Sequence, residues 1–415
     1  MKRLEKASKF NSKFQVYPSR EAGRVAGELA ALAESIPDVE NPPSDYGVHR
    51  AELKRRLQGE VALLDHYLSG KACDFDTIIA RYGIPLSDIT QLRGWLEANR
   101  ERTLDSIDRL FQSTEVENYE LGLQVDVPTV KRKAEKFGSV RIQKYHKILG
   151  TLLQDLSRVG ESLQNIDAVP TTNDRSYFNP STMALAIAIP AIVYSSEDGS
   201  LHLRERELIK LYGHEGMGHA LNHVVTSTTD LPYFLTKAST LTEATMESVA
   251  QFYQQVIFDD LKNSPETQKA LGIKRIFDEI YQEAKDTTLL EEYNLKLFQY
   301  AISVLGDKSL GDHDDPAVVK KKIELLSEVT LEPTYPLHFV EQNRYGFDLQ
   351  GNLNFQLVSE LRYAAQPVQR ALQDFERQGI RYDENGRSTI DETFLKGFWT
   401  PIGFVDNARV VAKHK

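Results

Sequence analysis

Apolar residues recur at intervals of three or four positions over most of this 415-residue chain, the spacing of one face of an α-helix. In residues 20–36, for example, Val25, Leu29 and Leu32 share this spacing, and the pattern stops before Pro37. The same periodicity predicts further amphipathic helices over residues 49–69, 86–114, 128–160, 317–329 and 353–379. We therefore expect a mainly α fold.

One segment differs from this pattern, because residues 185–194 are rich in Ile and Val. That composition favours a β-strand, and Pro190 predicts a strand at a sheet edge, since proline cannot donate a ladder hydrogen bond. Residues 195–200 then form a turn, and two helices follow over 201–225 and 240–261. We expect a short edge strand or small sheet beside the first of these helices.

A run of turn-forming residues, 168–182, is the best candidate for a boundary between lobes. It divides the chain into a helical lobe, 1–167, and a second lobe, 168–415, with a cleft between them. Residues 383–387 carry a second turn signal, which predicts a turn before the last helix.

The charge balance narrows the classes of partner. Lys plus Arg number 50 and Asp plus Glu number 60, a net charge of −10, which argues against nucleic acid and anionic membrane as partners. The single cysteine, Cys73, cannot form an intrachain disulfide, and the charged N-terminus lacks the apolar stretch of a signal peptide. The longest apolar run, 183–194, is shorter than the ~20 residues of a membrane helix. These features predict a soluble, cytoplasmic protein.

Candidate chemistry is concentrated at His214, Glu215 and His219. Two neutral imidazoles can hold a zinc ion, and a carboxylate directly after the first histidine lies beside the metal-bound water to accept its proton. This spacing is one residue longer than the usual H-E-x-x-H motif. The extra residue changes where the two histidines lie around the helix axis.

Residues five apart on an α-helix lie about 140° from each other, so His214 and His219 cannot share a metal there. They converge only where the helix widens locally, as in a π-bulge. Gly213, Gly216 and Gly218 fit such a distortion, because each costs roughly 0.5–1 kcal/mol inside a regular helix. We therefore predict a widened turn at this segment.

Two alternatives compete with this interpretation. His219 and His223 are four apart and could share a metal without any bulge, but Glu215 would then lie a full turn before the first ligand. The residues could also be ordinary helix histidines without a metal. We favour His214 and His219 because only that pair keeps the carboxylate adjacent to a ligand.

A catalytic zinc needs a third protein ligand, and the chain offers Glu243 and Glu247, one helical turn apart. One can bind the metal while the other accepts a hydrogen bond from a ligand histidine. A solvated acidic face is the alternative, but most of the surrounding residues are apolar or small: Ala244, Met246, Val249, Ala250 and Phe252.

The stretch from His214 to His219 resembles the H-E-x-x-G-H helix of the dipeptidyl peptidase III family, which has the same extra residue. Residues 234–253 resemble the segment of that family that leads into its Glu-x-x-x-Glu-Ser-Val helix. The resemblance implies a helical zincin-type metallopeptidase with one Zn²⁺ per chain. By this resemblance Glu243 is the third ligand and Glu247 supports a ligand.

The resemblance extends to substrate-binding positions. Glu117 and Tyr119 lie in a Glu-Asn-Tyr element, in which the glutamate holds the substrate's N-terminal ammonium and the tyrosine donates to the oxyanion. The segment with Ala188 and Pro190 is similar to the family's edge strand, which pairs with the backbone of the substrate. Less supported oxyanion donors are Tyr253, His338 and Tyr345.

The chain also departs from that family, whose known members are much longer. The resemblance covers residues 116–260, and the family's asparagines near the edge strand have no clear equivalent in 191–197. No histidine lies between His223 and His313 to match the family's downstream catalytic histidine. The Gly-His-Ala-Leu stretch is also similar to thimet-oligopeptidase-like and thermostable carboxypeptidase families, which use the shorter spacing.

These observations predict a zinc-dependent peptidase, a hydrolase whose general base is Glu215 and whose substrate is a peptide. The resemblance implies exopeptidase activity of the dipeptidyl peptidase kind. The alternatives are a carboxypeptidase or oligopeptidase of another zinc family, and a catalytically inactive peptide-binding protein on a peptidase scaffold.

Overall fold

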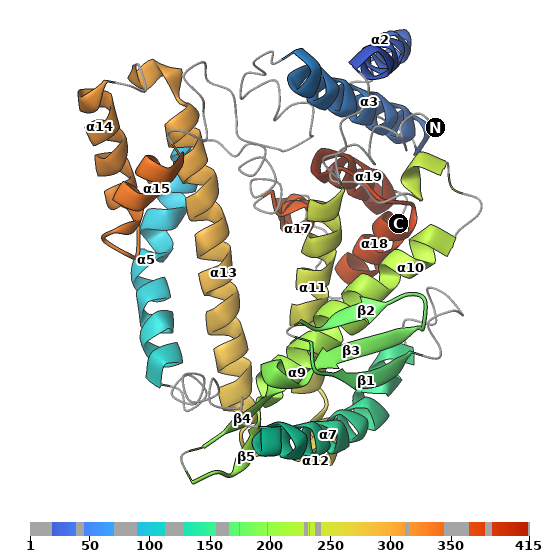
Figure 1. Ribbon diagram of the computed structural model, residues 1–415, viewed down its shortest axis with the longest axis vertical. Coiled ribbons are helices and arrows are strands. Elements are labelled where there is room, and N and C mark those ends of the chain that lie inside the picture. The colour runs from blue at the N-terminus through green and yellow to red at the C-terminus, as the bar shows by residue number, and fades with distance from the viewer. Residues whose placement is uncertain are drawn as a thin grey trace. The chain divides into compact units, whose positions relative to one another are not determined.

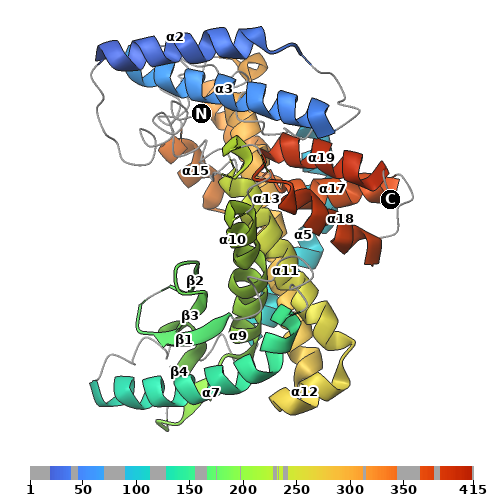
Figure 2. The same ribbon diagram turned by 90° about the vertical axis from the view of Figure 1, so that its right-hand side faces the viewer.

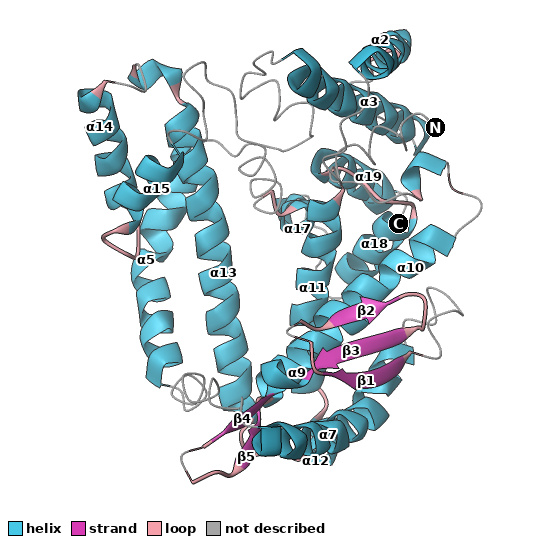
Figure 3. Ribbon diagram, in the orientation of Figure 1, coloured by secondary structure: helices cyan, strands magenta, loops and turns pink. Residues whose placement is uncertain are grey.

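The computed structural model is mainly helical, as predicted (Figures 1 and 3). None of the helices in the described residues is long and apolar enough to cross a membrane. The structure describes residues 19–38, 45–69, 89–112, 128–154, 166–173, 175–196, 198–227, 231, 233–236, 242–311, 315–343, 365–377 and 384–413.

The chain forms two compact units. Unit 1 comprises Met1–Arg100, Thr228–Ser248 and Tyr293–Lys415, and unit 2 comprises Glu101–Ser227 and Val249–Glu292. The expected boundary at residue 168 lies inside unit 2. Helices α5, α11 and α13 each contain residues of both units.

Unit 1 is built from helices at both ends of the chain. These are α2 (Ser19–Ser35), α3 (Asp45–Ser69), α14 (Pro316–Ser327), α15 (Tyr335–Asn343), α17 (Pro367–Arg377), α18 (Glu384–Leu395) and α19 (Pro401–Lys413), with parts of α5 (Ile89–Gln112) and α13 (Phe277–Gly306). They confirm the predicted helices at 20–36, 49–69 and 317–329 and, over its described residues 89–112, the one at 86–114. The turn expected at 383–387 is wrong in part, because α18 begins at Glu384 and packs on α17 and α19, and such packing overrides a local turn preference.

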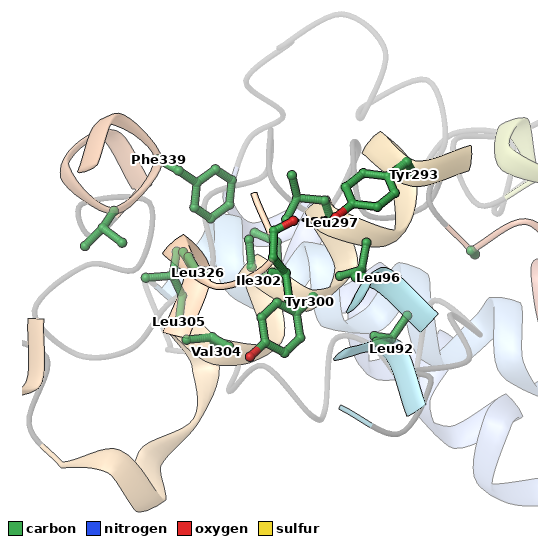
Figure 4. Packing of buried hydrophobic residues seen from close by; sticks show 14 of the residues in the cluster. Leu92, Leu96, Tyr293, Leu297, Tyr300, Ile302, Val304, Leu305, Leu326 and Phe339 are labelled. Carbon is green, nitrogen blue, oxygen red and sulfur yellow. Dashed lines mark hydrogen bonds between the residues drawn. The ribbon is translucent and has the colours of Figure 1, made fainter. Parts of the chain in front are cut away.

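The main hydrophobic core of unit 1 lies between α5, α13, α14 and α15 (Figure 4). Leu96 of α5 and Leu326 of α14 are fully buried there, and the rings of Phe298 and Phe339 meet edge to face. A second cluster joins α2 to α3 through Leu29 and Leu57. Val25 and Leu29 of the predicted apolar face of α2 are buried, whereas Leu32, which was expected on the same face, is exposed.

Unit 2 contains two small sheets (Figure 3). In the first, β3 (Ala184–Ala188) lies between β1 (Asp167–Thr171), to which it is parallel, and β2 (Tyr177–Asn179), to which it is antiparallel. In the second, β4 (Val193–Ser195) and β5 (Leu201–Leu203) form a hairpin. Helix α7 (Pro128–Gln154) packs against β1, β4 and β5 (Figure 2).

The predicted strand over 185–194 is confirmed in part, because residues 185–188 belong to β3 and residues 193–194 to β4, but the expectation that the segment is one edge strand is wrong. Ala188 ends a central strand that is buried along its whole length and pairs on both sides. Pro190 lies in the first turn of a short helix, α8 (Ile189–Ile192), where a missing N–H costs nothing. The turn-rich residues 168–182 contain β1 and β2, so the edges of the sheet come from the segment that was expected to be a boundary.

Three consecutive helical pieces follow the sheets: α9 (Glu205–Leu211), η4 (Tyr212–His219) and α10 (Ala220–Ser227). The helix expected from residue 201 begins at Glu205, because β5 occupies the preceding residues. After the 3₁₀ turn η5 (Tyr233–Leu235), α11 runs from Glu243 to Lys262, close to the predicted 240–261. The remaining elements are α12 (Pro265–Leu271) and the 3₁₀ turn η6 (Lys308–Leu310).

Candidate metal centre

The segment η4 is a π-helix of eight residues with α-helix on both sides. Its i→i+5 hydrogen bonds add one residue to each turn, so residues five apart come to the same face. His214 and His219 are such a pair. The local widening predicted from their spacing is confirmed.

His214, Glu215 and His219 form a cluster in which one ligand atom from each residue lies within 4.8 Å of the others. The two imidazole rings are 5.0 Å apart between centroids and almost perpendicular, at 85°. All three side chains are partly buried. His223 is not a member of this group, so the geometry favours the pairing of His214 with His219 over the pairing of His219 with His223.

Close packing against α11 explains two of the three glycines of η4. A Cβ on Gly213 would lie 2.6 Å from the Tyr253 carbonyl oxygen, and a Cβ on Gly218 would lie 2.4 Å from the Ala250 Cα. Backbone atoms cannot move aside as a flexible side chain can, so neither position accepts a larger residue without a shift. The third, Gly216, is also buried.

The three-stranded sheet contacts η4 through β2 and β3. The backbone N–H of Phe178 in β2 donates a hydrogen bond to Glu215 Oε2, at 3.2 Å. Because N–H groups of successive strand residues point to opposite edges, this N–H lies on the outer edge of β2, away from β3. The carboxylate beside the two histidines is therefore oriented by the main chain of an edge strand.

Two further residues border the cluster. Asn222, three residues after His219, places its Nδ2 3.1 Å from His219 Nδ1. Fully buried Tyr212 stacks on His146, with ring centroids 6.0 Å apart, and burial raises the pKa of the tyrosine. A helical polar residue at i+3 is the signal that would have pointed to Asn222.

The remaining predicted site residues lie on other elements or outside the described residues. Glu243 and Glu247 begin α11 in the part that belongs to unit 1, directly after Thr242, whose carbonyl accepts from the Met246 N–H. Their assigned roles stay predictions. Tyr253 is fully buried in α11, and His338 lies in α15. Glu117, Tyr119 and Tyr345 lie outside the described residues.

The donor set of the cluster fits a zinc ion in its chemistry. Imidazole nitrogen and carboxylate oxygen are common zinc ligands, and two histidines from one helix supply half of a four-coordinate site. Comparisons with protein-family models, with curated proteins and with solved structures find no match for this chain.

Proposed function

We propose that this protein is a zinc-dependent peptidase with a helical, zincin-type catalytic region, similar to the dipeptidyl peptidase III family. The observation that carries the proposal is the convergence of His214, Glu215 and His219 on a π-helical turn. Close packing against α11 accounts for two of the glycines, but the π-helical distortion itself costs helix stability, and such distortions are frequent at functional sites. Metal binding gives the distortion a use.

In this proposal His214 and His219 hold one Zn²⁺ per chain, and Glu243 is the third ligand. Glu247 then accepts a hydrogen bond from a ligand histidine, which fixes the ring orientation.

When bound, zinc supplies a Lewis acid that polarises the scissile carbonyl and brings the pKa of its water down to about 7. Glu215 accepts the proton of the attacking water and passes it to the leaving amine. The Phe178 N–H holds one oxygen of that carboxylate, which leaves the other oxygen to carry the proton. Both proton transfers need the carboxylate of Glu215, and replacing Glu215 with glutamine, whose side chain is an amide, abolishes them.

The substrate in this proposal is a peptide that adds its backbone to a strand beside the site. With Ala188 in a central strand, we assign this role to the outer edge of β2, where the Phe178 N–H donates to Glu215 and the Phe178 carbonyl would accept from the peptide. Glu117 and Tyr119 keep their predicted roles at the substrate amine and the oxyanion. The single cysteine and acidic charge fit a cytoplasmic enzyme.

The experiment that tests the proposal is the substitution Glu215→Gln, assayed on a panel of fluorogenic peptides and for zinc content. We expect peptide hydrolysis to fall by at least about 10²-fold while zinc is retained, because the base is lost and both histidines remain. Glu207→Gln in α9 is the matched control and should keep both properties. Full activity in Glu215→Gln would show that the assigned base is wrong.

The same panel separates the kinds of peptidase. The panel includes peptides blocked at the N-terminus, at the C-terminus or at both ends. Cleavage that requires a free N-terminus is expected for a dipeptidyl-peptidase-like enzyme, and cleavage that requires a free C-terminus indicates a carboxypeptidase. Cleavage of peptides blocked at both ends indicates an oligopeptidase. Peptide binding without zinc and without cleavage would indicate an inactive scaffold.

A further inference from the structure

The geometry points to Asn222 as a positioning residue that determines which ring nitrogen of His219 is available to a metal ion. This inference rests on the proposed function, because it concerns a ligand of the proposed zinc. Asn222 itself would not touch zinc or substrate. It would act by holding the proton of the imidazole on Nδ1.

Asn222 lies on α10, one turn after His219, so their side chains share a helix face. Its Nδ2 is 3.1 Å from His219 Nδ1. Its other amide atom, Oδ1, is buried and has no hydrogen-bond partner among the described residues. The amide is therefore in contact with His219 at one atom and leaves an acceptor unused at the other.

A half-turn of the amide exchanges these two atoms and brings Oδ1 to His219 Nδ1. The carbonyl oxygen then accepts a hydrogen bond from Nδ1–H, and the buried acceptor gains a partner, as buried polar atoms nearly always do. With the proton on Nδ1, the lone pair of the neutral ring is on Nε2. Nε2 is then the nitrogen that can bind zinc, because a ligand atom must be unprotonated.

The sequence context argues against a purely structural role. Asparagine is a weak helix former, and Asn222 is only partly exposed between the fully buried Leu221 and other residues of α10. Leucine at this position would favour both the helix and its burial. A side chain that carries an acceptor to His219 is what the asparagine adds.

The first test compares zinc affinity in wild type, Asn222→Leu and Asn222→Asp, measured in the full chain by competition with a chromophoric chelator. Loss of the acceptor in Asn222→Leu should weaken zinc binding by about 10- to 100-fold, the usual effect of removing such a support. Asn222→Asp keeps an acceptor oxygen and should restore affinity to within about tenfold. Asn99→Leu, an asparagine-to-leucine change inside α5, is the control and should leave affinity unchanged.

The second test determines directly which ring nitrogen of His219 carries the proton. Long-range ¹⁵N–¹H correlation spectra of the histidine rings, recorded without metal, should show His219 protonated at Nδ1 in wild type and Asn222→Asp. Asn222→Leu should shift His219 toward the Nε2–H form. A merely structural asparagine would leave the tautomer unchanged.

The outcomes separate the two proposals. Tight zinc binding that is equal in wild type and Asn222→Leu overturns the role of Asn222 and leaves the peptidase proposal intact. A wild-type protein that binds no zinc overturns the peptidase proposal, and with it the role of Asn222 toward a metal. A wild-type His219 protonated at Nε2 overturns the role of Asn222 in either case.

Discussion

At Gly218 even a single added carbon would meet the backbone of Ala250, and at Gly213 it would meet the carbonyl of Tyr253. These two glycines allow α11 to pack directly on the π-helical turn that holds His214 and His219. The five-residue spacing of the histidines was enough to predict the widened turn. The contact with α11 was not predictable, because it joins residues more than thirty positions apart and depends on tertiary packing.

Gly218→Ala is expected to destabilise the protein by about 1–3 kcal/mol, the usual cost of overpacking, although alanine is the better helix former. Gly94→Ala is the matched control, since Gly94 lies inside α5 with nothing within 4 Å of an added Cβ. That variant should gain roughly 0.5–1 kcal/mol. Chemical denaturation of both variants measures the difference. Equal effects of the two substitutions would contradict the close approach at Gly218.

Among the elements, the long helices and strand β3 were predictable from the sequence, whereas strands β1 and β2 were not. An apolar face repeats several times within a helix such as α2 or α7, so its period stands out from the sequence. Strands β1 and β2 have five and three residues and contain Pro170 and Asn179, which are typical of turns. Their pairing with β3 decides their structure. The spacing of His214, Glu215 and His219 is local, so the sequence was enough to predict them as a group. The hydrogen bond from the β2 backbone to Glu215 was not predictable, because β2 itself depends on its pairing with β3.

The outer edge of β2 supports a test at the level of this element. Phe178→Pro removes the N–H that donates to Glu215 while leaving the ladder to β3, which uses the opposite edge. Under the proposed function, kcat/KM should fall roughly 10- to 150-fold relative to Phe178→Ala, which keeps the N–H. This matches the about 1.5–3 kcal/mol assigned to a hydrogen bond to a charged group. Equal kcat/KM in the two variants, with equal melting temperatures, would remove the role of this amide.

On the scale of the whole molecule, unit 1 joins segments from both ends of the chain. Fully buried Glu52 on α3 accepts hydrogen bonds from the N–H and hydroxyl of Thr400, at 2.8 and 2.7 Å, and pairs with Arg56 at 2.9 Å. Arg56 also donates to the carbonyls of Phe234 and Phe398. Burial alone would raise the pKa of Glu52, but the charges of Arg56 and Arg55 and the Thr400 hydrogen bonds hold it below its ordinary value. Contacts between α3 and residues far away in the sequence are not predictable from a periodic hydrophobic pattern.

Glu60, two turns further along α3, behaves in the opposite way. Burial raises its pKa from 4.5 to about 7, against the opposing charge of Arg56. The folded state therefore holds this proton more tightly than the unfolded state, and the stability of the wild type should fall as pH rises from about 4.5 to about 7.

Glu60→Gln should remove this pH dependence. Its stability should match that of the wild type near pH 4.5 and exceed it above pH 7, by up to about 3 kcal/mol at 1.36 kcal/mol per pH unit. Glu52→Gln is the control with the opposite sign, because it breaks a buried ion pair and should destabilise the protein at neutral pH. Unfolding curves from pH 4.5 to 8 measure both. A constant difference between Glu60→Gln and wild type would contradict the buried, protonated carboxyl.

The central claim is that a π-helical turn brings two histidines five positions apart to one zinc ion. Zinc titration of the full chain by calorimetry, in wild type and in His214→Ala, His219→Ala and His223→Ala, tests it most directly. The account predicts one zinc per wild-type chain, loss of that binding in His214→Ala and in His219→Ala, and retention in His223→Ala. Absence of zinc binding by the wild type, or binding that survives His214→Ala and is lost in His223→Ala, would contradict it.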